Sequence, residues 1–102
     1  MSLSQLGHAE LSRGNLDRGE ALIMEAVTFF REGFGEEHLY TVTAERGLAF
    51  AHVQRHRYRE ALVLYERILK VYSREIGPDN PATRLVQDNT RKIRRAVADS
   101  ER

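Results

Sequence analysis

Apolar residues recur every three to four positions along the whole chain, and no stretch alternates apolar with polar residues as a half-buried strand would. This spacing predicts an all-α protein. The apolar stripes fall into five segments, at residues 1–13, 17–32, 38–53, 58–76 and 81–98. The last segment is far more polar than the others, with Leu85, Val86, Ile93 and Val97 as its inward face.

The segments end at residues that disfavour helix. Breaks are predicted at Gly14-Asn15, at Gly33-Phe34-Gly35, at the polar stretch 54–57 and at the Gly77–Pro81 stretch. Proline at the first turn favours a helix start at Pro81. Asp17 with Glu20 three residues later resembles a capping box at the start of the second helix.

The chain repeats itself at an offset of 42 residues without a gap. The offset aligns Ala9 with Ala51, Arg13 with Arg55, Leu22 with Leu64, Gly35 with Gly77 and Thr41 with Thr83. Turn glycine and apolar stripes repeat together, which indicates a helical repeat protein. We therefore expect one domain over residues 1–102, with a first unit at about 1–37, a second at about 38–79 and a capping helix at about 80–98.

The second unit resembles a tetratricopeptide repeat. The resemblance rests on Leu48-Ala49, Tyr58, Ala61 and Tyr65, and more weakly on Leu6-Gly7 and Gly19 in the first unit. The Gly77-Pro78-Asp79-Asn80-Pro81 junction and the 42-residue period are similar to repeats of the kinesin-light-chain type, since the usual period is about 34. The resemblance implies antiparallel helical hairpins stacked as a short right-handed solenoid. Small residues at Gly7, Gly19, Ala49 and Ala61 would let paired helices approach closely.

Composition gives little support for catalysis. The chain has no cysteine, which fits a cytoplasmic protein, and no apolar run long enough to span a membrane. No serine lies in a G-x-S-x-G context and no phosphate-binding loop is present, so an enzyme is not expected. His52 and His56 are four residues apart, but His56 falls in a predicted turn. We therefore expect two polar turn residues and no metal or cofactor.

In the repeat family, the first helix of each hairpin lines a concave groove. The frame places Ser4, Leu11, Ser12, Thr43 and Asp88 there, together with the candidate partner-binding residues His8, Arg46, Phe50, Val53, Gln54, Asn89, Lys92 and Arg95. The terminal-carboxylate clamp of chaperone-binding relatives is not matched, because Ser4, His8 and Leu85 occupy three of its positions. The backbone-holding asparagine of kinesin-light-chain-like grooves is matched by Asn89, whereas Gln5 and Gly47 replace it in the first two units.

These residues predict a protein-interaction scaffold or adaptor that binds a protein or peptide, acidic and with an apolar anchor. Two alternatives remain open. Residues 1–51 hold 4 basic and 8 acidic side chains, whereas residues 52–102 hold 12 and 7. This polarity would suit a homo-oligomer that uses its end faces. The basic run Arg91, Lys92, Arg94 and Arg95 would suit nucleic acid, although its helix has no aromatic residue for stacking.

Overall fold

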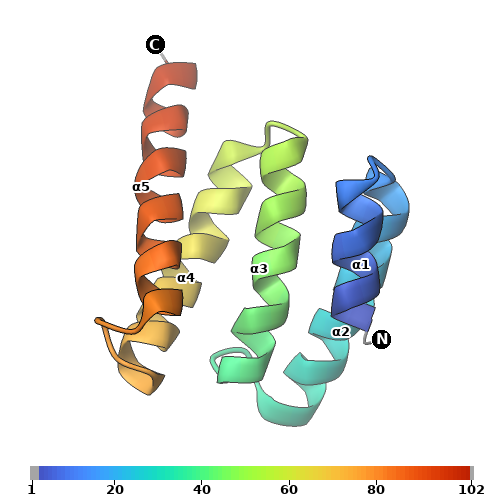
Figure 1. Cartoon of the computed structure of the whole chain (residues 1–102), viewed down its shortest axis with the longest axis horizontal. Helices are drawn as coiled ribbons and strands as arrows, with labels where there is room; N and C mark the ends of the chain where they lie inside the picture. Colours follow the sequence, from blue (N-terminus) through green and yellow to red (C-terminus); the bar gives the residue numbers. More distant parts are fainter. Residues whose placement is uncertain (1–2, 102) are drawn as a thin grey trace.

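A computed structural model describes residues 3–101, without the side chain of Ser4. It contains five helices, which are α1 (Leu3–Ser12), α2 (Leu16–Phe34), α3 (Leu39–Gln54), α4 (Tyr58–Glu75) and α5 (Pro81–Ser100) (Figure 1). No strand occurs in this described part of the chain. The predicted all-α class is confirmed. Residues 1–2 of the first predicted segment lie outside the described residues, and the other predicted ends agree with the helix ends to within two residues.

The helices pair as two hairpins followed by a single helix. α1 packs on α2, α3 packs on α4, and α5 packs on α4. In Figure 1, α1, α3 and α5 stand in a row, with α1 in front of α2 and α5 in front of α4. The molecule measures 38 × 32 × 21 Å. The first helices of the hairpins and α5 therefore form one layer, and α2 and α4 form the other.

Close contact within the first hairpin depends on two glycines. A β-carbon on Gly7 would lie 2.5 Å from Cγ1 of Ile23, and one on Gly19 would lie 2.7 Å from Cγ of Leu11 and 2.9 Å from the carbonyl oxygen of Gly7. In the second hairpin, Ala49 and Ala61 are fully buried. The prediction that these small residues permit close helix approach is confirmed.

Two apolar clusters hold the layers together. One is built mainly from α2 and α3, around Leu11, Ile23, Ala26, Val27, Ala44, Leu48 and Ala51. The other joins α3, α4 and α5 around Val42, Ala49, Ala61, Tyr65, Ile68, Val71, Tyr72, Val86 and Ile93. Two expectations were wrong. Leu11 belongs to the first cluster and does not face the groove, and Leu85 is 49% exposed instead of packing inward on α4.

The helices end at the predicted breaks. Gly14, Gly35 and Gly77 all have φ between 85° and 91°, a conformation that glycine adopts without strain. Asn80 caps α5 by accepting a hydrogen bond from the Ala82 amide at 2.9 Å.

The predicted capping box of Asp17 and Glu20 at the start of α2 was wrong. α2 begins at Leu16, and Asn15 at its cap donates to the Glu10 carboxylate at 2.7 Å. Glu20 pairs instead with Arg55, 3.0 Å away at the end of α3.

One carboxylate lies completely inside the molecule. Glu45 on α3 has no exposed surface and accepts a hydrogen bond from Arg67 of α4 at 3.0 Å. Burial raises the pKa of Glu45, and this effect outweighs the opposing attraction of Arg67 and Arg31. Desolvation therefore makes the charged carboxylate costly even beside its partner.

We predict that Gly19→Ala destabilises the protein by about 1–3 kcal/mol, because the new methyl group would overlap Leu11 and the backbone of Gly7. The matched control is Gly33→Ala, where an added β-carbon meets nothing within 4 Å. This second change should stabilise α2 by about 0.5 kcal/mol through helix propensity. Urea denaturation followed by circular dichroism measures both. Equal effects of the two substitutions would contradict the close-packing account.

We also predict a pH-dependent effect of Glu45→Gln. Because the pKa of Glu45 is raised in the folded state, the folded protein holds this proton over a pH range in which the unfolded chain has lost it. The contribution of Glu45 to stability is therefore full below the unfolded pKa and is lost as pH rises through the folded pKa. The stability of the variant relative to the wild type should therefore increase over the range in which pH rises above the unfolded pKa of a glutamate, about 4.3. Denaturation curves that keep a constant difference across this range would refute the assignment.

Candidate functional site: a groove along the first helices of the repeats

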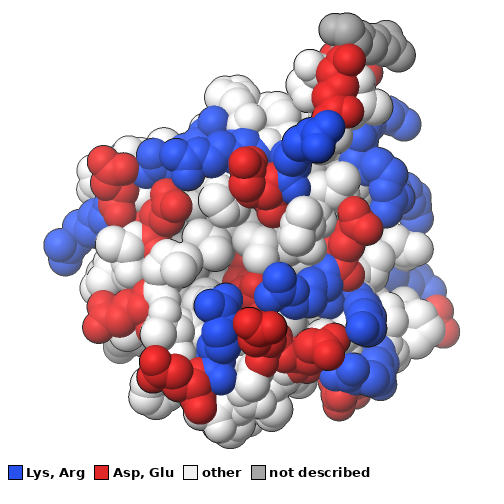
Figure 2. Space-filling view, turned by 180° about the vertical axis from the view of Figure 1, so that it is seen from behind, with Lys and Arg blue, Asp and Glu red and all other residues white. Residues whose placement is uncertain are grey.

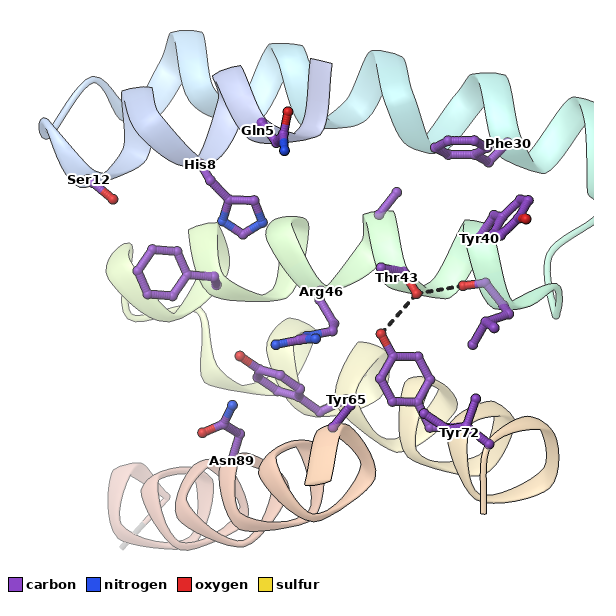
Figure 3. A pocket seen from close by; sticks show the side chains of 15 residues that line it. Gln5, His8, Ser12, Phe30, Tyr40, Thr43, Arg46, Tyr65, Tyr72 and Asn89 are labelled. Carbon is purple, nitrogen blue, oxygen red and sulfur yellow. Dashed lines mark hydrogen bonds between the residues drawn. The ribbon is translucent and has the colours of Figure 1, made fainter. Parts of the chain in front are cut away.

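A pocket of about 890 Å³ opens on the face formed by α1, α3 and α5. Its lining is contributed by all five helices and by Ile76 after α4 (Figure 3). It consists of Gln5, His8, Ser12, Phe30, Leu39, Tyr40, Thr43, Ala44, Arg46, Phe50, Tyr65, Tyr72, Ile76, Ala82 and Asn89. The lining is mainly apolar and aromatic, and none of these residues is acidic. Its volume is within the range of sites that bind ligands or peptide side chains, about 300–1,000 Å³.

The polar side chains meet near one end of the pocket. Arg46 extends from α3, and Figure 3 shows it between His8 of α1 and the side chains of Tyr65 and Asn89. Phe50 lies beside this group, with its ring centroid 6.3 Å from that of His8. Within residues 3–101, Arg46 makes no ion pair with a carboxylate. A positive charge therefore stands in the groove without an acidic partner.

The other end of the pocket is aromatic. Phe30 and Tyr40 lie 6.0 Å apart between ring centroids, and Tyr72 faces them across the pocket. The hydroxyl of Thr43 donates to the carbonyl of Leu39 at 2.7 Å. The Tyr72 hydroxyl, 2.9 Å away, therefore donates to Thr43. This pair of hydrogen bonds fixes the ring of Tyr72 as one wall.

Electrostatic effects leave Arg46 as the constant charge of the site. Burial, and to a smaller extent the charge of Arg46, lowers the pKa of His8, so the imidazole is neutral at neutral pH. Burial raises the pKa of Tyr65, which keeps its hydroxyl protonated. The polar end of the pocket thus holds one fixed cation and several neutral hydrogen-bonding groups.

The opposite face of the molecule has a different chemistry. Figure 2 shows basic and acidic side chains interleaved over it. Many charged side chains of the molecule are paired, including Lys70 with Glu37 at 3.1 Å and Arg57 with Glu20 at 3.8 Å. Paired surface charges contribute little to stability and leave little unbalanced field for a partner. The groove is thus distinguished by an apolar surface with one unpaired charge.

A family profile described as tetratricopeptide repeat matches residues 1–74, which span α1 to α4 and most of the chain. The chain belongs to the tetratricopeptide repeat family. No significant match was found among curated proteins or among solved structures. Proteins of this family generally serve as modules that bind proteins or peptides, which indicates a general role in protein–protein interaction for this chain. No helix within residues 3–101 is both long and apolar enough to cross a membrane.

The structure brings only part of the expected tetratricopeptide groove together. His8, Arg46, Phe50 and Asn89 line the pocket, as do Ser12 and Thr43. The side chain of Ser4 lies outside the described residues.

The remaining candidate residues lie elsewhere. Val53 packs against the α3–α4–α5 cluster, and Gln54 is half-buried at the last position of α3. Lys92 and Arg95 are exposed on α5 but do not line the pocket, and Asp88 lies 4.0 Å from Arg91 on the same helix. α5 turns Ala82 and Asn89 towards the pocket, so its basic side chains lie beyond the rim.

Several pocket residues were missed by the sequence reasoning. Tyr65 and Tyr72 were assigned to the core, and their rings are indeed buried, but both also line the pocket. Tyr40 is 54% exposed and lies three residues before Thr43, on the same helical face. That spacing in the sequence could have identified Tyr40. The periodicity predicts which side of α4 is buried, but it could not predict that the tyrosine rings on that side also extend into the groove.

The His52–His56 pair does not form a shared site. α3 ends at Gln54, and His56 lies in the following turn with φ of 60° and its Nδ1 2.7 Å from the Tyr58 hydroxyl. His52 remains on the helix, and burial lowers its pKa. No group of three or more metal-binding side chains occurs in the described part of the chain.

Proposed function

We propose that this protein binds a segment of another protein in the groove, through an apolar or aromatic anchor and an acidic side chain, without catalysing a reaction. One observation carries the proposal. The pocket joins an aromatic end, at Phe30, Tyr40 and Tyr72, to an unpaired cation at Arg46, and no acidic side chain lines it. An apolar side chain can be buried at one end while a carboxylate reaches the other.

Exposure of the groove residues supports the proposal. Phe50 is 37% exposed and Tyr40 is 54% exposed, although neighbours on the same helix, such as Val42 and Ala49, are fully buried. Aromatic residues that remain partly exposed on a rigid helix lose little conformational freedom when a partner covers them. Arg46 can form two parallel hydrogen bonds with a carboxylate, which a lysine could not do.

The test uses peptides selected from a displayed random library on the immobilised protein. We predict a consensus with an acidic residue near an aromatic or large apolar residue. The combined change Phe50→Ala and Arg46→Glu should weaken a selected peptide about tenfold or more, with unchanged helicity and melting. The control is Arg91→Glu, which changes an exposed charge outside the pocket. A well-folded double variant that binds the peptide as tightly as the wild type would refute the groove assignment.

A second candidate function, self-association through the ends of the molecule, is favoured by a separate observation. On α2, Met24 is 37% exposed and Phe29 is 69% exposed, and they border a shallow hollow with Glu25 and Glu32. At the other end, α5 exposes the basic residues Arg84, Arg91 and Arg95. An acidic, apolar face and a basic face on one molecule favour head-to-tail contact.

Self-association should be visible by light scattering from micromolar to millimolar protein. If the end faces meet, the mean mass rises with concentration, and the double change Glu25→Lys and Glu32→Lys abolishes the rise because like charges then oppose each other. Salt at about 0.5 M should also weaken it. Glu60→Lys, on the exposed surface of α4, is the control. A strictly monomeric wild type at all concentrations would exclude this second candidate.

Nucleic-acid binding gains no comparable support. Two of the basic side chains of α5 lie near acidic residues, Arg84 at 3.4 Å from Asp79 and Arg91 at 4.0 Å from Asp88. The helix contains no aromatic residue on which a base could stack. We therefore do not propose a nucleic-acid partner.

A further inference from the structure

The hydroxyl group of Tyr65 lies at the end of a nearly buried side chain. Tyr65 is only 5% exposed, with its ring in the α3–α4–α5 cluster. Figure 3 shows its hydroxyl directed into the pocket, near Arg46 and Asn89. Tyr72 and Tyr58 both have a hydroxyl partner, Thr43 at 2.9 Å and His56 at 2.7 Å respectively. Tyr65 has none within residues 3–101, so its hydroxyl is free to bond a ligand in the pocket.

Two further hydrogen-bond donors lie beside this hydroxyl. The guanidinium of Arg46 and the side-chain amide of Asn89 also have no side-chain hydrogen-bond partner in the described part of the chain. The three groups come from three helices, α3, α4 and α5, and all are drawn towards the same part of the pocket. An Arg fork, a phenol and an amide together supply N–H and O–H donors to one point.

These three side chains offer several hydrogen-bond donors and one positive charge, and no carboxylate is among the residues that line the pocket. This combination favours a negatively charged acceptor as the ligand. A planar carboxylate can accept from the guanidinium with both oxygens and still accept from a phenol or an amide with its remaining lone pairs. A neutral side-chain amide would do less well, because it carries no charge to pair with Arg46 and because hydrogen bonds donated to a neutral carbonyl are weaker than those donated to a carboxylate. The environment therefore distinguishes a carboxylate from its amide.

We propose that Tyr65, Arg46 and Asn89 form a carboxylate-binding subsite of the groove, in which the Tyr65 hydroxyl adds to the preference of Arg46 for the ionised acid over its amide. This inference rests on the proposed groove function. It also limits the spacing in the bound segment. Tyr40 and Arg46 are six positions apart on α3, about 9 Å along the helix. An extended peptide covers this distance in about two to three residues, which separates the apolar anchor from the carboxylate.

The probes are two pairs of short peptides that differ only at the carboxylate. N-acetyl-Phe-Ala-Glu-amide and N-acetyl-Phe-Ala-Gln-amide test a side-chain carboxylate. N-acetyl-Phe-Ala-Ala with a free terminus and its amide test a terminal carboxylate. Chemical-shift titration of isotope-labelled protein at low salt gives the affinity of each peptide. We expect the acid of at least one pair to bind about tenfold more tightly than its amide. The pair that shows the larger ratio identifies the source of the carboxylate.

Tyr65→Phe is the decisive variant, because it removes the hydroxyl and keeps the ring. It should reduce the acid-to-amide ratio about threefold or more while leaving the affinity for the amide peptide unchanged. Melting should also be unchanged, since this hydroxyl has no hydrogen bond to lose. Tyr58→Phe is the matched control, because it deletes a hydroxyl outside the pocket and should leave the ratio unaltered. Arg46→Gln should bring the ratio close to one.

The results separate this inference from the proposed function. Equal binding of acid and amide, with shifts at groove residues, would overturn the carboxylate subsite and retain the groove. An unaltered ratio in Tyr65→Phe would overturn the role given to Tyr65. Shifts confined to residues outside the groove, or no binding by any of the four peptides at millimolar concentration, would overturn both.

Discussion

The absence of a side chain at Gly47 lets three helices meet at one point. A β-carbon there would lie 2.8 Å from Cδ1 of Ile23 on α2 and 3.1 Å from Nε2 of His8 on α1. α3 can therefore pack closely against the first hairpin, which brings His8 over the same groove as Arg46 and Phe50. The sequence frame placed a peptide-holding asparagine at this position in relatives. In this protein the position serves helix packing instead, and the polar recognition that we propose uses Arg46, Tyr65 and Asn89.

Arginine side chains have two different environments in this molecule. Some form ion pairs between helices, whereas Arg46 lines the pocket. Arg67 lies against the fully buried Glu45, and Arg55 lies 3.0 Å from Glu20, so these arginines join one helix to the next. Arg46 is also on α3 but turns towards the pocket, where no carboxylate meets it. An arginine without a partner has no stabilising role of this kind. Its position beside aromatic rings suits the carboxylate binding that we propose.

Much of the fold followed from the sequence, because helix periodicity, glycine breaks and the 42-residue offset are local or repeated signals. The site followed only in part. Side-chain direction on α5 depends on how that helix rotates against α4, which turns Asn89 towards the pocket and leaves Lys92 and Arg95 outside it. Val53 is partly buried against the α3–α4–α5 cluster, so it does not line the groove. Glu20 does not cap α2 as predicted, because its carboxylate pairs with Arg55, which is 35 positions away in the sequence.

We propose that partners enter the groove formed by α1, α3 and α5 and do not bind the outer faces of α2 or α5. Intermolecular nuclear Overhauser contacts between the labelled protein and a library-selected peptide test it most directly. The account predicts contacts from the peptide to the rings of Tyr40 and Phe50 and to the side chain of Asn89. Contacts to Met24 and Phe29, or to the exposed basic side chains of α5, with none in the groove, would contradict it.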